Sequence, residues 1–162
     1  MAALDRFRQA QNDPHSGFAA ALAEIRGGGK RGHWIWYVFP QLSGLGFSEM
    51  SEHYAIANRS EAEAYLRDPV LRPRLEEITT AVAEQLRRGV PVTVVMGSRT
   101  DAIKLVSSLT LFGTVARTMA TSDPGLQTFA DTANEVLDAA ETQGFERCTY
   151  TSAQLLDGRK SR

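Results

Sequence analysis

Apolar residues at helical spacing form the dominant pattern of this chain. The clearest stripe lies between the pair Asp68-Pro69 and Gly89. Its members are Leu71, Leu75, Ile78, Val82 and Leu86. Aspartate before proline is a typical helix start, and a glycine after the last apolar position is a typical stop. The pattern therefore predicts an amphipathic helix across this segment.

Further helices are predicted on both sides of this one. Asp13-Pro14 marks one start, with Gly27 as its stop, and Ser60 with Glu63 forms a capping-box pattern at another. The remaining candidates cover residues 4–11, 48–57, 101 to about 116 and 126 to about 142. Most of the chain is thus predicted to be helical.

Residues 90–96 have a strand-like composition, because valines and a threonine dominate them. A single strand has no partner for its backbone hydrogen bonds. We therefore expect extended chain or the start of a short buried helix here. The patterns together predict an all-α fold, a single compact domain over residues 1–162 with roughly six to eight helices and little or no sheet.

Composition agrees with one packed domain. The chain has 162 residues, of which 43% are hydrophobic and 23% charged, so it can bury a core without a disulfide or a metal. Its 18 basic and 19 acidic residues give a net charge of -1, which argues against nucleic acid as a partner.

The number of cysteines and the length of apolar runs indicate the cellular compartment of the protein. Cys148 is the single cysteine, and a lone thiol is typical of a reducing compartment. The sequence contains no run of about 18 apolar residues that could span a membrane, and residues 1–12 lack the apolar core of a signal peptide. We expect a soluble, cytoplasmic monomer without membrane association.

The first candidate for chemistry is the segment from His33 to Gln41, which contains both tryptophans, Trp34 and Trp36. Such a concentration of aromatic residues is either a plug of the core or a surface on which a flat ligand stacks. Apolar packing explains the aromatic side chains but not His33 and Gln41. We take these two as candidate acid–base and ligand-binding groups.

The second candidate is the helix predicted from Asp101. At 100° per residue, Lys104, Ser107 and Ser108 share one side of this helix with Asp101. The N–H groups at the helix start, with Lys104 nearby, are suited to a phosphate or carboxylate. The alternative is structural: Thr100 or Asp101 caps the helix, and Lys104 pairs with Asp101 one turn away.

Other motifs exclude several chemistries. The glycine-rich residues 27–32 lack the spacing of a phosphate-binding loop, the three histidines lack metal-ligand spacing, and no G-x-S-x-G elbow occurs. We therefore predict no metal site and no cofactor. Glu52, beside His53 and Tyr54, is a general acid or base if burial raises its pKa, and is merely solvated on a surface helix.

The two candidate segments also carry a family resemblance. The stretches are H-W-I-W-Y-V-F-P-Q at 33–41, G-L-G at 44–46, Y-A-I at 54–56, E-A at 61–62, Y-L at 65–66, P-V-L at 69–71, and K-L with S-S-L-T-L-F within 104–112. They resemble the family called domain of unknown function 1810. The resemblance implies an all-α single domain and leaves the activity open, because the function of that family is not established.

A shorter resemblance rests on Glu52-His53-Tyr54. This stretch is similar to one in the YbiA-like proteins of the NADAR superfamily, which are small, mainly helical domains linked to NAD and ADP-ribose chemistry. The resemblance implies a nucleotide-derived ligand.

Two hypotheses for function remain open. In the first, a nucleotide-like or ADP-ribose-like molecule binds where the two segments meet: Trp34 or Trp36 stacks on a base, and Lys104 holds an anionic group. His33 or Asp101 then supplies acid–base function. If the protein is an enzyme, the reaction is hydrolysis of an N-glycosidic bond, with Glu52 or Asp101 activating water.

The second hypothesis is a non-enzymatic protein-interaction module, in which the aromatic segment belongs to the core. The two hypotheses place polar groups differently. A ligand site predicts that His33, Lys104 and Ser108 converge on a concave pocket with an exposed aromatic face, and an interaction module predicts a flat apolar patch.

Overall fold

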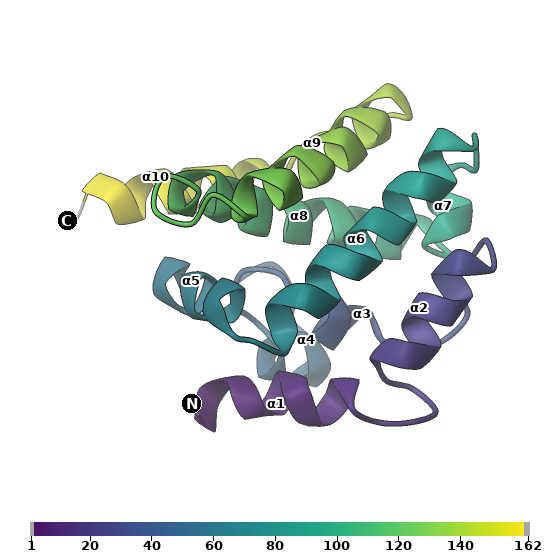
Figure 1. The fold of residues 1–162 in the computed structure, drawn as a ribbon, viewed down its shortest axis with the longest axis horizontal. Helices are drawn as coiled ribbons and strands as arrows, with labels where there is room; N and C mark the ends of the chain where they lie inside the picture. Colours follow the sequence, from purple (N-terminus) through teal and green to yellow (C-terminus); the bar gives the residue numbers. More distant parts are fainter. Residues whose placement is uncertain (1, 161–162) are drawn as a thin grey trace.

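The computed structural model describes residues 2–160, and side chains within 3–157, as a layered arrangement of α-helices (Figure 1). The helices are α1 (Ala2–Gln11), α2 (Phe18–Arg26), α3 (Ile35–Val38), α4 (Glu49–His53), α5 (Arg59–Arg67), α6 (Leu71–Arg87), α7 (Val92–Val95), α8 (Arg99–Met119), α9 (Leu126–Thr142) and α10 (Thr149–Lys160). The all-α prediction is confirmed.

The predicted number of helices is too low, because the described residues form ten. No helix was predicted over α3, which has only four residues, or over α10, whose apolar periodicity is weak. Helices of little more than one turn hold too few positions to show a period. The range 90–96 contains α7, so a short buried helix is the correct alternative for that segment.

Helix α8 lies at the centre of the molecule and is buried on most of its surface. It packs along α9 and also contacts α5, α10, α7 and α3. Helix α6, with its predicted apolar stripe, packs against α9 and α2 and crosses in front of α8 (Figure 1). Side chains from all these elements join one hydrophobic core.

Two predicted helix starts are displaced. Asp13 Oδ1 accepts hydrogen bonds from the N–H groups of His15 and Ser16, at 2.8 and 2.9 Å, so it closes a turn and α2 begins only at Phe18. Helix α5 begins before Ser60, because Asn58 Oδ1 accepts from the Glu61 N–H at 3.0 Å. Asp68 Oδ1 likewise accepts from the N–H groups of Val70 and Leu71, and α6 begins at Leu71, close to the predicted start.

The range 48–57 is only partly helical, because its last residues pair with an earlier segment. Ile56 forms an isolated parallel bridge with Leu42. The Ile56 N–H donates to Gln41 O at 2.9 Å, and Ser43 N–H donates to Ile56 O at 2.8 Å. This pairing holds residues 41–43 beside the start of α5, and Tyr150 of α10 contacts the same segment.

None of the helices in the described part of the chain combines the length and the apolar composition that crossing a membrane requires.

Candidate functional site

The aromatic segment meets the start of α8 through a contact between Trp36 and Lys104 and through Lys30, which covers Trp34 and pairs with Asp101. Lys30 Nζ lies 4.9 Å from the ring centroid of Trp34, and Lys104 Nζ lies 5.0 Å from that of Trp36. The Asp101 carboxylate lies between the lysines, 2.8 Å from Lys30 Nζ and 4.0 Å from Lys104 Nζ. Two cations thus balance the charge of Asp101, which ties the loop before α3 to the start of α8.

Trp34 is fully buried and belongs to the core, so the predicted role of a stacking surface passes to its alternative, Trp36. Its Nε1 donates to Glu24 Oε1 at 3.0 Å, and the N–H groups of Arg31 and Gly32 donate to the same oxygen, each at 2.7 Å. Burial raises the pKa of Glu24, but these three hydrogen bonds outweigh burial, and the net pKa is lowered. Glu24 is therefore the anion that organises this loop.

Trp36 is the partly exposed tryptophan of the segment. Lys104 covers its ring, and the side chain of Lys104 is 22% exposed. Trp36 Nε1 is buried and has no hydrogen-bond partner within the described residues, and the same holds for Ser108 Oγ in the interior. A ligand would have to displace core side chains to reach Ser108.

Ser107 does not share a surface with Lys104. It lines a separate hollow of about 270 Å³ with Arg99 and Phe145. The sequence predicted Lys104, Ser107 and Ser108 on one side of α8. Other helices pack against α8 on several sides, so these residues lie in different surroundings.

The remaining predicted residues lie apart from this cluster or at its edge. His33 is exposed in the loop before α3, and Gln41 is half-buried beside the bridge to Ile56. Glu52 is exposed on α4, whose end is held against α1 by a hydrogen bond from Arg6 Nε to His53 O at 2.9 Å. Figure 1 draws α4 near α1, away from the start of α8 beside α7. Glu52 and Asp101 therefore do not form one catalytic pair.

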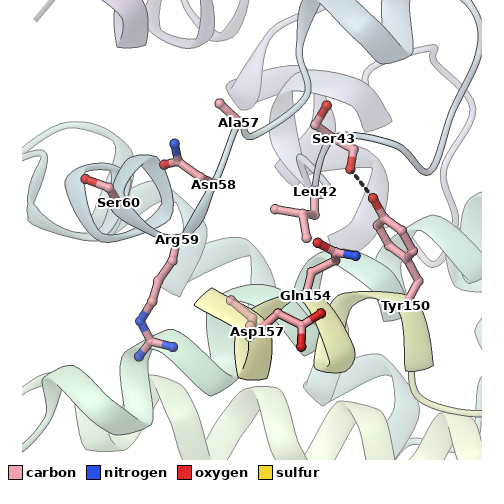
Figure 2. Close-up of a pocket in the computed structure, with 10 residues that line it drawn as sticks. Leu42, Ser43, Ala57, Asn58, Arg59, Ser60, Tyr150, Gln154 and Asp157 are labelled. Atoms are coloured by element: carbon pink, nitrogen blue, oxygen red, sulfur yellow. Dashed lines mark hydrogen bonds between the residues drawn. The ribbon is translucent and has the colours of Figure 1, made fainter. Parts of the chain in front are cut away.

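A larger cavity, of about 790 Å³, lies between the start of α5, the bridge segment and α10. Figure 2 shows Tyr150, Gln154 and Asp157 projecting from α10 on one side, with Asn58 and Arg59 on the other. Leu42 lies between these two walls (Figure 2). The residues predicted from sequence as site residues do not line this cavity.

Arg59 is the cation of the cavity wall, and its side chain is only 11% exposed. Its Nε donates to Glu63 Oε1 at 3.3 Å. Glu63 also pairs with Arg67, whose Nη2 lies 3.6 Å from Glu63 Oε2. The two Nη groups of Arg59 have no hydrogen-bond partner in the part of the chain that the structure describes. The edge of the guanidinium that carries the two Nη groups, which commonly binds an oxyanion through parallel N–H donors, is therefore available.

The opposite wall is fixed by Tyr150. Its hydroxyl donates to Ser43 O at 2.9 Å (Figure 2). The neighbouring Gly44 has φ +100°, and a Cβ at this position would overlap the Tyr150 hydroxyl. The backbone conformation and the close approach both require glycine.

Sequence reasoning missed this cavity because its walls come from distant parts of the chain. Residues 42–60 form one wall and residues 150–157 the other, and α10 has only a weak apolar periodicity. G-L-G at 44–46 was the available signal. Among the described residues, no group of three His, Cys, Asp or Glu side chains is placed to hold a metal ion.

Comparisons with known proteins agree on the fold and name no activity. A family model described as "Protein of unknown function (DUF1810)" matches residues 1–141. The crystal structure of the conserved hypothetical protein Rv1873 from Mycobacterium tuberculosis is similar, with 34% identity and a TM-score of 0.73, over 94% of this chain and 96% of that one. No curated protein matches this chain.

Proposed function

Because this chain belongs to the family described as "Protein of unknown function (DUF1810)", we propose its function from the geometry of the cavity: it binds a small, anionic, nucleotide-like molecule between α5 and α10. One copy of the chain supplies every wall of this cavity. The proposal is therefore compatible with a monomer.

The observation that carries the proposal is the nearly buried Arg59 guanidinium, which faces the cavity with both Nη groups unpaired. A buried cation is costly unless it is paired and hydrogen-bonded. Its shared, long contact with Glu63 satisfies only one of five N–H donors. A phosphate or carboxylate that accepts from both Nη groups supplies hydrogen-bond partners for the remaining donors of Arg59.

The rest of the wall suits the other parts of a nucleotide. Tyr150 offers an aromatic ring, and Leu42 and Leu155 offer apolar surface. Asn58 and Gln154 supply polar groups at the edge of the cavity. The volume of about 790 Å³ falls within the usual range for small-molecule sites, about 300–1,000 Å³.

If the protein is an enzyme, the proposed reaction is hydrolysis of an N-glycosidic bond in the bound ligand. It needs a carboxylate beside that bond to activate water. Asp157 is a carboxylate on the cavity wall, whereas Glu52 and Asp101, favoured by the sequence, do not line it. Asp157 is accordingly the residue to replace first when release of a free base is measured.

The residues at the start of α8 define a second location for the same ligand class. There, Trp36 and Lys104 are the residues to test for ligand binding. His33 and Gln41 are polar residues close to Trp36 in the sequence. Lys104→Gln removes the cation that covers Trp36 and leaves the cavity between α5 and α10 unchanged. It therefore separates the two locations in one assay.

A thermal-shift assay tests the proposal. The probes are AMP, ADP-ribose, NAD and ribose 5-phosphate, with neutral adenosine as control. We expect the anionic probes to raise the melting temperature by about 5–10 °C at a hundredfold excess over Kd, and adenosine to have a much smaller effect. The shift should persist in Lys104→Gln.

A shift that Lys104→Gln abolishes would move the site to the start of α8. If the protein melts cooperatively and none of the probes changes its melting temperature, that result would contradict ligand binding and favour the interaction module.

One observation supports this second function, a protein-interaction module. Phe47, with Met50 nearby in sequence, is 90% exposed, which is unusual for a large apolar side chain.

A further inference from the structure

We infer that α10 selects the ligand: Tyr150 and Gln154 recognise a planar nitrogen heterocycle, while Arg59 holds the anionic group common to all ligands. The inference rests on the proposed function, because it assigns a division of labour within the same cavity. It names the ligand class as a nucleobase attached to an anionic tail.

The two walls of the cavity differ in chemistry and come from different parts of the chain. The wall around the start of α5 carries the cation, Arg59, and precedes residue 141, where the match to the family model ends. The wall formed by α10 begins at Thr149, beyond that match. The anion-binding part of the cavity thus lies within the residues that the family model matches, and the α10 part lies beyond them.

The Tyr150 ring is held in a fixed position. The hydrogen bond to Ser43 O and the close approach of Gly44 hold the phenol at its hydroxyl end. The ring also lines the cavity (Figure 2). A ring that is already fixed loses little conformational entropy when a base stacks on it, and stacking is sensitive to the presence of a planar partner.

Gln154 lies beside Tyr150 on the wall of the cavity. It follows Tyr150 by four residues in α10, so both side chains lie on one face of the helix, and Figure 2 shows both beside the cavity. Its amide has no hydrogen-bond partner among the described residues. An amide presents a donor and an acceptor side by side, which matches the edge of a base such as adenine.

These groups predict discrimination between ligands that share an anion. AMP has a base and a phosphate, whereas ribose 5-phosphate has the phosphate alone. The α10 residues should contribute to binding of the first ligand and hardly to binding of the second. Arg59 should contribute to both.

Isothermal titration calorimetry with AMP and ribose 5-phosphate tests the inference. We expect Tyr150→Leu and Gln154→Leu each to weaken AMP binding about tenfold and to change ribose 5-phosphate binding by less than about twofold. Tyr150→Phe keeps the ring and should retain most of the preference for AMP. Ser152→Ala, an exposed position of α10 outside this cavity, is the matched control.

Circular dichroism of each variant confirms that it is folded before titration. Equal weakening of both ligands by Tyr150→Leu and Gln154→Leu, or no weakening of either, would overturn selection by α10 while leaving anion binding intact. If the wild-type protein binds neither ligand, the proposed function fails and the inference fails with it.

Discussion

At the residue scale, single polar groups organise segments that lack regular structure. Glu24 is the clearest case, since one carboxylate oxygen accepts three hydrogen bonds from the loop that leads to α3. The sequence marked Trp34 by its aromatic neighbours but gave no sign of its partner, because Glu24 lies ten residues earlier on another helix. Contacts of this kind depend on the tertiary fold and leave no local pattern.

Replacing Glu24 by Gln should destabilise the protein at neutral pH. A neutral amide accepts more weakly than a carboxylate, so we expect a loss of about 1 kcal/mol, or a melting temperature lower by about 2–4 °C. The folded-state pKa of Glu24 is below its usual value, so its contribution is complete above about pH 4.5 and is lost as pH falls through the folded pKa.

Thermal unfolding of both proteins at pH 7 and below about pH 4 checks this prediction. The difference between wild type and Glu24→Gln should shrink at the lower pH. A difference that stays constant, or grows, would contradict the assigned role of the carboxylate.

Gly44 and Gly89 allow backbone strain to be separated from close contact. Both have positive φ, at +100° and +89°. A Cβ at Gly89 meets nothing within 4 Å, whereas one at Gly44 overlaps the Tyr150 hydroxyl. We expect Gly89→Ala to cost about 1 kcal/mol and Gly44→Ala about 1–3 kcal/mol more, because the alanine also displaces Tyr150. Equal melting temperatures for the two variants would count against the Tyr150 contact.

At the element scale, the apolar periodicity of a helix decides whether the sequence predicts it. The long helices α6, α8 and α9 have enough turns for their apolar stripes to stand out. The short helix α3 has too few turns for such a stripe, and the 12-residue α10 has only a weak apolar periodicity. Helix starts were less predictable than helix interiors, because several cap residues often compete near one start.

The start of α8 offers a direct test. The sequence indicated Thr100 or Asp101 as the cap, and the structure has Ser98, whose Oγ accepts from the Asp101 N–H at 3.1 Å. We expect Ser98→Ala to lower the free energy of unfolding by about 1 kcal/mol and exposed Thr100→Ala to lower it by less than about 0.5 kcal/mol. Urea denaturation measures both values, and the reverse order would refute the observed cap.

At the scale of the whole molecule, the sequence predicted the all-α class but did not indicate the cavity between α5 and α10. The aromatic segment and the start of α8 do meet, as expected, yet Trp34 is buried in the core and Asp101 is neutralised by lysines. The cavity instead joins Arg59 and Tyr150, which are far apart in the chain. Periodicity and motif spacing describe neighbours in sequence, so they could not bring these two residues together.

The central claim is that the unpaired guanidinium of Arg59 binds the anionic group of a nucleotide-like ligand. The most direct measurement is the affinity of AMP for Arg59→Gln compared with Arg67→Gln, by isothermal titration calorimetry. Arg67 is the matched control, because it lies on the same helix and contacts the same Glu63 but is 64% exposed. Arg59→Gln should weaken binding at least about tenfold, and Arg67→Gln should leave it within about twofold. Equal affinities for Arg59→Gln and wild type would contradict the claim.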